Sequence, residues 1–197
     1  SRSFPGWSWE EGRVPNVGNL MPLALVGAEL QLLSWNGRGI AVHRTKEFHS
    51  QGAAIRKLSK NRDILCFQEV HGKSPAVKHN FQRLLPGWRI CISVCRDFQN
   101  FEDPSSGGVV VAICPRLCSL CNIELLEIVP GRCISVSLWA LASGVKRSLH
   151  ILTLHNFGLN HNQVSSIGNR MKQLHDDCHR QPHLEFACFV GDFNFPA

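Results

Sequence analysis

Four apolar segments of the 197-residue chain each end in polar side chains that can bind a metal ion or a phosphate group. Residues 32–35 precede Asn36, residues 64–68 precede Glu69, residues 149–154 precede His155 and Asn156, and residues 189–191 precede Asp192 and Asn194. If these segments are strands that end at one edge, the polar groups converge on one site. A single amide or carboxylate after a strand is often only a turn residue or a helix cap, so the prediction depends on the whole set.

The chemistry that suits this set is metal-assisted hydrolysis of a phosphate ester. Glu69 can anchor Mg²⁺ or Mn²⁺ with help from Asn36 or Asp192, because hard ions take one or two carboxylates together with phosphate oxygens. The amides of Asn36 and Asn194 can donate to phosphate oxygens without adding negative charge. His155 can protonate a leaving oxygen, although the chain has ten histidines and one of them after a strand is unsurprising.

The composition indicates one folded unit with an anionic partner. Apolar residues make up 44% and charged residues 18%, and the formal charge of +6 favours nucleic acid as that partner. Seven Lys or Arg against one acid, Glu47, lie between positions 36 and 62. A basic helix there is either a nucleic-acid contact or a solvated face, and both interpretations stay open.

The nine cysteines lie mostly in apolar runs, which is typical of buried thiols in a reducing compartment. A zinc knuckle is the less favoured interpretation of one group, which consists of Cys114, Cys118, Cys121 and Cys133. The sequence contains no run of eighteen apolar residues and no signal peptide, so we expect no membrane span and an intracellular, nuclear or cytoplasmic protein.

The hydrophobic patterns predict an irregular leader over residues 1–28 and one domain over 29–197. Strands are expected at 29–35, 63–68, 88–95, 107–113, 123–128, 133–141, 148–154 and 184–190, and helices at 44–60, 75–85 and 163–179. This order predicts an α+β fold, a four-layered α/β/β/α sandwich of two mostly antiparallel sheets. A doubly wound α/β sheet is the rival, weakened because residues 88–154 offer no crossover helix.

Five segments occur in an order that resembles the endonuclease/exonuclease/phosphatase superfamily. They are residues 33–39 (Leu-Ser-Trp-Asn-Gly-Arg-Gly), 63–69, 106–111, 152–155 and 190–194 (Val-Gly-Asp-Phe-Asn), with Gln68-Glu69 and 191–194 the most specific. Within the superfamily the chain is similar to the endonuclease-like domain of LINE-type retrotransposons. The Leu154-His155 pair also resembles pancreatic-type deoxyribonuclease.

The resemblance implies roles for particular residues. It implies that Glu69 binds the metal ion with Asn36 and Asp192, and that Asp192 and Asn194 position the attacking water and the phosphate. It implies that His155 acts on the leaving group as in the deoxyribonuclease and sphingomyelinase-like branches, whereas abasic-site endonucleases and many retrotransposon enzymes use other residues at that position. We add Arg38 and Asn156 to Asn36 as candidates for binding the substrate.

The chain departs from the superfamily in one respect: no closing Ser-Asp-His motif occurs after residue 194. We therefore expect a carboxy-terminally truncated domain with an open sheet edge and little activity of its own. The leading hypothesis is a DNA endonuclease of a retrotransposon-like element, with a reverse transcriptase domain downstream. The alternatives are a phosphatase or sphingomyelinase-like enzyme of the same fold, and an inactive remnant that binds nucleic acid.

Overall fold

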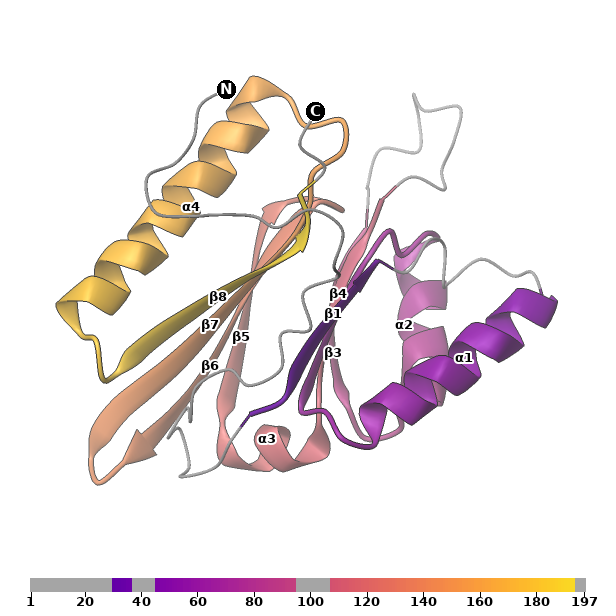
Figure 1. The fold of residues 1–197 in the computed structure, drawn as a ribbon, viewed down its shortest axis with the longest axis horizontal. Coiled ribbons are helices and arrows are strands. Elements are labelled where there is room, and N and C mark those ends of the chain that lie inside the picture. Colours follow the sequence, from indigo (N-terminus) through magenta and orange to yellow (C-terminus); the bar gives the residue numbers. More distant parts are fainter. Residues whose placement is uncertain (1–29, 37–44, 95–106, 194–197) are drawn as a thin grey trace, which may run out of the picture.

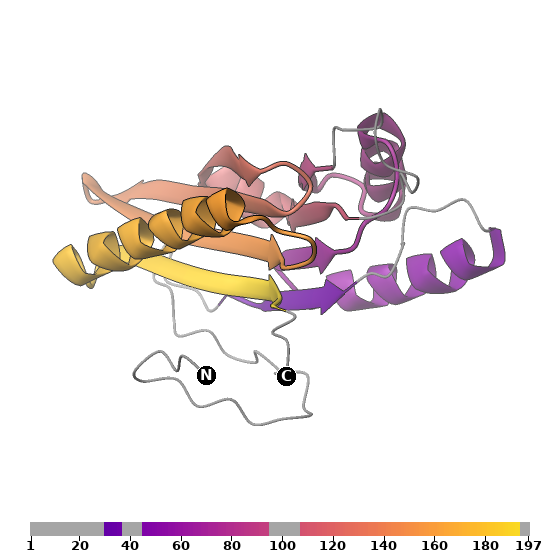
Figure 2. The same ribbon diagram turned by 90° about the horizontal axis from the view of Figure 1, so that it is seen from above.

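Two four-stranded sheets face each other, and helices cover their outer sides (Figure 1). The computed structural model describes residues 30–36, 45–94 and 107–193, so Arg38, Asn194 and the predicted leader lie outside the described residues. The view from above separates the layers, with α4 on one side and α1 and α2 on the other (Figure 2). The predicted four-layered sandwich is confirmed, and the doubly wound alternative is wrong because the strands form two sheets.

The first sheet has the strand order β1-β2-β4-β3. Its elements are β1 (Leu32–Asn36), α1 (Thr45–Ser59), β2 (Ile64–Gln68), α2 (Ser74–Leu84), β3 (Arg89–Ser93) and β4 (Val109–Ile113). Strands β1 and β2 are parallel and flank α1 in the sequence, whereas the other two pairs are antiparallel. The predicted strand, helix, strand unit is therefore present, and both its strands end at the same edge.

The second sheet has the order β5-β6-β7-β8. Its elements are β5 (Asn122–Val129), β6 (Cys133–Ala142), β7 (Val145–His155), α4 (His161–Arg180) and β8 (Glu185–Asp192). Strands β5 to β7 form an antiparallel meander, and β8 pairs in parallel with β7 after the chain crosses through α4. Each sheet therefore contains one parallel pair of strands, β1 with β2 and β7 with β8. The carboxyl ends of these four strands lie in one region.

One helix was not predicted. Residues Pro115–Leu120 form α3, which follows β4 of the first sheet and precedes β5 of the second. The expectation of consecutive strands without a helix was wrong here, because six residues are too few to give a helical pattern of hydrophobicity. Pro115 at the start of the helix was the available local signal.

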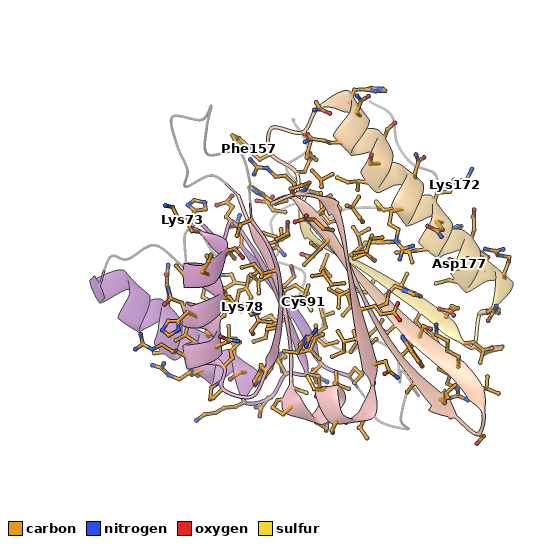
Figure 3. The ribbon with its side chains drawn as sticks, turned by 180° about the vertical axis from the view of Figure 1, so that it is seen from behind. Lys73, Lys78, Cys91, Phe157, Lys172 and Asp177 are labelled. Carbon is orange, nitrogen blue, oxygen red and sulfur yellow. The ribbon has the colours of Figure 1, made fainter. Side chains whose placement is uncertain are left out.

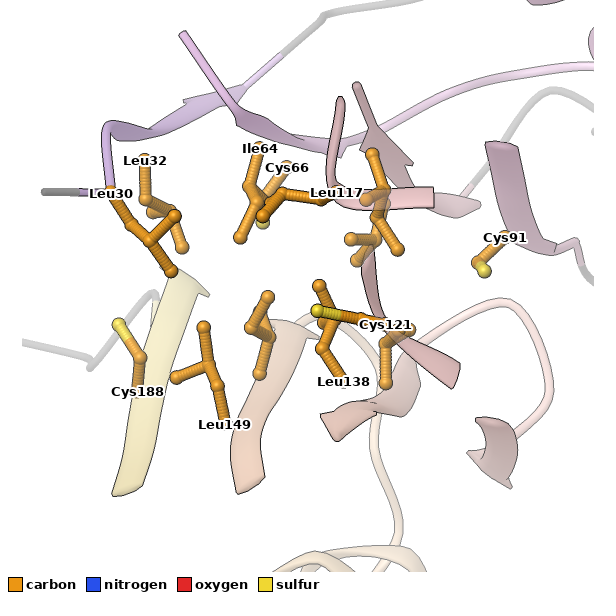
Figure 4. Close-up of a cluster of buried hydrophobic side chains, with 14 of the residues drawn as sticks. Leu30, Leu32, Ile64, Cys66, Cys91, Leu117, Cys121, Leu138, Leu149 and Cys188 are labelled. Carbon is orange, nitrogen blue, oxygen red and sulfur yellow. The ribbon is translucent and has the colours of Figure 1, made fainter. Parts of the chain in front are cut away.

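The layer between the sheets is apolar through most of its length. Leu32, Ile64 and Cys66 from the first sheet face Leu138, Leu149 and Cys188 from the second (Figure 4). On the outer faces, Phe81 of α2 packs with Phe67 of β2, and Leu174 of α4 packs with Leu152 of β7. Burying both faces of the sheets supplies the main favourable free energy of folding.

At one end of this layer the inward side chains become polar. The strand alternation that points Ile64 and Cys66 inward also points Gln68 inward, and it turns Thr153 inward after Ile151. Gln68 is buried, and its Nε2 donates to Ser34 Oγ at 3.1 Å and to Thr153 Oγ1 at 3.0 Å. A buried side chain of the first sheet is thus hydrogen-bonded to the second.

Gln68→Leu is expected to destabilise the fold by about 1–3 kcal/mol, because it leaves buried hydroxyls without their amide partner while changing the volume little. Urea unfolding measures the loss. The control Gln82→Leu changes an exposed residue of α2 and should alter stability by less than about 0.5 kcal/mol. Equal stabilities of the two variants would contradict the importance of the inter-sheet hydrogen bond.

Candidate active site

Two carboxylates from different sheets meet at the polar end of the inter-sheet layer. Asn36 Nδ2 donates to Glu69 Oε1 at 3.0 Å and to Asp192 Oδ2 at 2.7 Å. Asn36 is the last residue of β1, Glu69 follows β2, and Asp192 is the last residue of β8. One amide nitrogen therefore holds two acids together across the sandwich.

His155 completes the cluster from the end of β7. Its Nε2 lies 3.3 Å from Glu69 Oε1, and its side chain is only 4% exposed. Arg132 Nη1 lies 2.9 Å from His155 Nδ1. Because a guanidinium can only donate, Nδ1 is the acceptor and the neutral ring carries its proton on Nε2, directed at the Glu69 carboxylate.

The electrostatic environment keeps His155 neutral. Burial lowers its pKa below the ordinary value of 6.5, and the nearby Arg132 charge lowers it further. Glu69 and Asp192 act in the opposite direction but do not reverse the shift. At neutral pH the ring is therefore a donor of one hydrogen bond and not a cation.

Glu69 is held in an unusual backbone conformation. Its φ is +54°, in the left-handed region that non-glycine residues rarely adopt. The next residue, Val70, donates its backbone N–H to Gly108 O at 3.0 Å, and a Cβ on Gly108 would lie 2.0 Å from Val70 O. The glycine before β4 thus permits the close backbone approach that orients Glu69.

Gly191 has the same function for Asp192. It pairs with Leu154, the residue before His155, and a Cβ at Gly191 would lie 1.9 Å from Leu154 O. Its φ of +149° also disfavours other residues. Close contact between β7 and β8 at this position brings His155 and Asp192 into register as neighbours.

The carboxylates of Glu69 and Asp192 fit a divalent metal ion, whereas His155 in this tautomer uses Nδ1 to accept from Arg132 and carries a proton on Nε2, so it lies beside such an ion as a hydrogen-bond donor. One ligand atom from each of Glu69, His155 and Asp192 lies within 4.8 Å of the others. The Glu69 side chain is 26% exposed, so an ion can reach it from solvent. Two carboxylates favour a hard ion such as Mg²⁺ or Mn²⁺, which keeps several water ligands in addition to protein oxygens.

Four of the predicted site residues are brought together: Asn36, Glu69, His155 and Asp192. Asn156 is adjacent, and its Nδ2 donates to the backbone oxygen of Phe193 while its N–H donates to Asp192 O at 2.8 Å. It therefore braces the end of β8. Arg38 and Asn194 lie outside the described residues, and their roles stay predictions, as do the individual catalytic roles of the other residues.

Two residues beside the cluster were missed in the sequence. Arg132 lies in the turn before β6, and its carbonyl accepts the N–H of His155 at 2.8 Å. Phe157, two residues after His155, is 60% exposed with its ring stacked on the His155 ring. Neither belongs to a motif, and only the pairing of β6 with β7 brings Arg132 to the site.

The cysteine group does not form a metal site among the described residues, where the group of side chains placed closely enough to share an ion consists of Glu69, His155 and Asp192. Cys114 and Cys121 flank α3, and Cys133 begins β6. Burial raises the pKa of all three thiols, that of Cys133 to about 12. The favoured interpretation as buried thiols agrees with this environment.

Comparison with solved structures identifies the fold. The chain is similar to truncated TDP2 of Caenorhabditis elegans (TM-score 0.52, 17% identity, covering 85% of this chain and 63% of that chain). It is also similar to ANGEL2, a 2′,3′-cyclic phosphatase (0.53, 13%, 84% and 52%). A third structure is a mannosyl-6-phosphatase of Bacteroides thetaiotaomicron (0.52, 16%, 85% and 66%).

These structures belong to the endonuclease/exonuclease/phosphatase superfamily, and the chain has the fold of that superfamily. The resemblance drawn from the motifs is thereby confirmed for the fold. The chain spans about half to two thirds of the length of the structures it matches. No family model matches the sequence, and no curated protein matches it. Among the described helices, none combines the length and apolar character needed to cross a bilayer.

Gly191→Ala is expected to destabilise the fold by on the order of 1–3 kcal/mol, because the new Cβ would meet the backbone of Leu154. Thermal and urea unfolding measure the change. The control is Gly168→Ala within α4, where a Cβ has open space and should stabilise the chain by about 0.5–1 kcal/mol. If Gly191→Ala were as stable as the control, the close approach of β7 and β8 would not be required.

His155 is expected to make the fold less stable in mild acid. Its pKa is lowered in the folded chain and returns to about 6.5 on unfolding, so below that pH the unfolded chain binds a proton first. Stability is lost as the pH falls from 6.5 to the folded pKa, and above 6.5 the residue contributes no pH dependence. Urea unfolding at about pH 8 and about pH 5 should show a smaller loss for His155→Gln than for the wild type.

Substitution of an exposed histidine is the matched control for this measurement. His183→Gln should retain the acid-induced loss seen in the wild type, because His183 is exposed and lies outside the cluster. An equal loss for His155→Gln and the wild type would contradict a buried neutral imidazole.

Proposed function

We propose that this domain is a metal-dependent phosphodiesterase, and specifically an endonuclease that cleaves DNA with Mg²⁺ or Mn²⁺. The observation that carries the proposal is the convergence of Glu69, Asp192 and His155 around the amide of Asn36. These groups come from four strand ends in two sheets, so their meeting is not a consequence of local sequence. The superfamily fold agrees with the proposal, although fold alone does not select a substrate.

The residues of the chain have distinct tasks in this proposal. Glu69 and Asp192 would hold the metal ion, and Asn36 keeps the two carboxylates at a fixed separation by donating to both. The Nε2 proton of His155 is directed at the Glu69 carboxylate in the structure, and when a substrate is bound it would be donated to a phosphate oxygen instead. Proton donation to a leaving oxygen is the second role proposed for the same Nε2–H.

When bound, the divalent ion supplies Lewis-acid stabilisation of charge on the phosphate and lowers the pKa of a water molecule. Arg132 adds a fixed positive charge on the far side of His155, 2.9 Å from Nδ1. A phosphate group that enters this site would therefore meet the N–H donor of His155, which has the cationic guanidinium behind it, and the carboxylates that would hold the metal. That combination stabilises the charge that develops during phosphoryl transfer.

A DNA substrate and a retrotransposon-like origin extend the proposal. The charge of +6 favours a polyanion, and Arg56, Lys57 and Lys60 at the end of α1 are exposed. The motif order is similar to that of LINE-type endonuclease domains, and a reverse-transcriptase sequence encoded downstream would support this origin. Phosphatase and sphingomyelinase-like enzymes of the same fold are the alternative activities. An inactive remnant is the other alternative, and it would not bind the metal ion.

Glu69→Gln is expected to weaken Mn²⁺ or Mg²⁺ binding by roughly 100-fold or more. Mutation of a residue that only supports a metal ligand already lowers metal affinity by about 10–100-fold. Glu69 would be a ligand itself, so a larger loss of affinity is expected. Calorimetric titration of the 197-residue chain measures the affinity. The control is Glu124→Gln, since the Glu124 carboxylate lies outside the cluster and bonds Trp139 Nε1 at 2.9 Å.

Plasmid nicking tests the reaction in a protein that also carries a closing Ser-Asp-His motif. Nicking should require Mg²⁺ or Mn²⁺ and should be lost in Glu69→Gln but not in Glu124→Gln. Metal affinity that is unchanged in Glu69→Gln, or nicking that persists in it, would rule out the proposed site.

A further inference from the structure

An exposed aromatic ring stands directly beside the metal-binding cluster. Among the large hydrophobic side chains that are exposed in the described part of the chain, Phe157 is the only aromatic one, and it is 60% exposed. It lies in the loop between β7 and α4, and Figure 3 shows it at the same end of the molecule as Lys73, which precedes α2. Isolated exposed hydrophobic residues are common on protein surfaces, so exposure alone does not indicate a binding role. The location and the contacts of Phe157 must indicate one.

The ring is fixed by two residues of the site. It stacks on the His155 ring with a centroid distance of 6.1 Å and an interplanar angle of 12°. The guanidinium carbon of Arg132 lies 5.8 Å from the Phe157 centroid, within the range of a cation–π contact. Arg132 thus contacts both His155 and Phe157, and the three side chains form one unit that we name the stacking platform.

The backbone on both sides of Phe157 is also anchored. Asn156 is hydrogen-bonded to the end of β8 through its side chain and its N–H. Asn160 caps α4 by accepting from the N–H of Gln163 at 3.0 Å, and the Gln163 side chain accepts from the N–H of Asn160 at 2.9 Å. A ring held this way loses little conformational entropy when a ligand covers it.

The ligand class follows from the chemistry of the platform. A flat apolar ring beside a phosphate site matches a substrate that carries a π face next to its phosphate. Nucleotides carry such a face on the base, whereas sugar phosphates and phospholipid headgroups carry none. Bases inside a duplex are already stacked, so the ring is available only to an unpaired base. We propose that the stacking platform binds an unpaired nucleobase next to the scissile phosphate and selects single-stranded or frayed nucleic acid as the substrate.

Base stacking on Phe157 rests on the function proposed above, and it is tested separately from metal binding. Fluorescence anisotropy would measure the affinity of the 197-residue chain for a short labelled oligothymidylate and for an abasic oligomer of equal length. EDTA prevents cleavage, and the salt concentration stays constant because phosphate contacts depend on it. Phe157→Ala and Phe157→Leu should weaken oligothymidylate binding by roughly 5- to 150-fold.

The same two substitutions should leave the affinity for the abasic oligomer within about twofold, since no base is present to stack. Phe157→Trp should retain or strengthen oligothymidylate binding because it keeps a π face. The control Leu141→Ala removes another exposed hydrophobic side chain, on β6, and should behave as the wild type. Thermal unfolding of each variant verifies that the fold is intact.

Three outcomes would overturn base stacking: no measurable oligothymidylate binding by the wild type, full binding by Phe157→Leu, or equal weakening of both oligomers. Binding of the wild type to sphingomyelin vesicles that is lost in Phe157→Ala would instead assign the ring to a lipid surface. Metal affinity distinguishes the two proposals. If Glu69→Gln abolishes metal binding while Phe157→Ala leaves oligothymidylate affinity unchanged, the phosphodiesterase site stands and the stacking role fails.

Discussion

The arrangement of this domain depends on how the two sheets are joined at one end. Through most of their length they are held by non-directional apolar contact, which does not specify how one sheet is aligned with the other. At the polar end, Asn36 donates to acids from both sheets, and Gln68 donates to Thr153 across the layer. Buried polar groups are costly unless they are paired, so these hydrogen bonds are satisfied in one relative position of the sheets.

Alignment of the sheets and assembly of the site are therefore the same event. Asn36 and Glu69 belong to the first sheet, whereas His155 and Asp192 belong to the second. Each sheet contributes its groups through a parallel pair of strands, whose carboxyl ends lie side by side. A shift of one sheet against the other by a single residue would separate the two carboxylates and leave the amide of Asn36 with one partner.

The site concentrates local strain that the apolar layers must offset. Glu69 has a positive φ, and Gly108 and Gly191 allow backbone contacts that any Cβ would prevent. Two carboxylates held by one amide also repel each other, and a divalent ion would relieve that repulsion. When no ion is bound, the strained backbone and the two close carboxylates make the folded chain less stable than an unstrained arrangement would be. This cost is expected where the geometry of a site serves binding as well as folding.

The sequence by itself determined the kinds of elements and the groups that end them. The alternating and buried patterns indicated the strands and three of the helices, and the four polar strand ends together with the motif order indicated a metal-assisted phosphate site. These features are local: each depends on the periodicity of a segment and on the residue that follows it. For the same reason the short helix α3 was missed, since six residues give no detectable period.

Only the tertiary structure decided which groups meet and in what chemical form. Arg132 lies in an ordinary turn, and it reaches His155 because β6 pairs with β7 at that register. That contact selects the proton on Nε2, and burial between the sheets lowers the pKa of the ring. The role proposed for Phe157 likewise depends on tertiary contacts, because it is inferred from the position of the ring beside His155 and Arg132. Distances, burial and protonation are set by contacts between residues far apart in the chain, and the pattern of a single segment does not specify them.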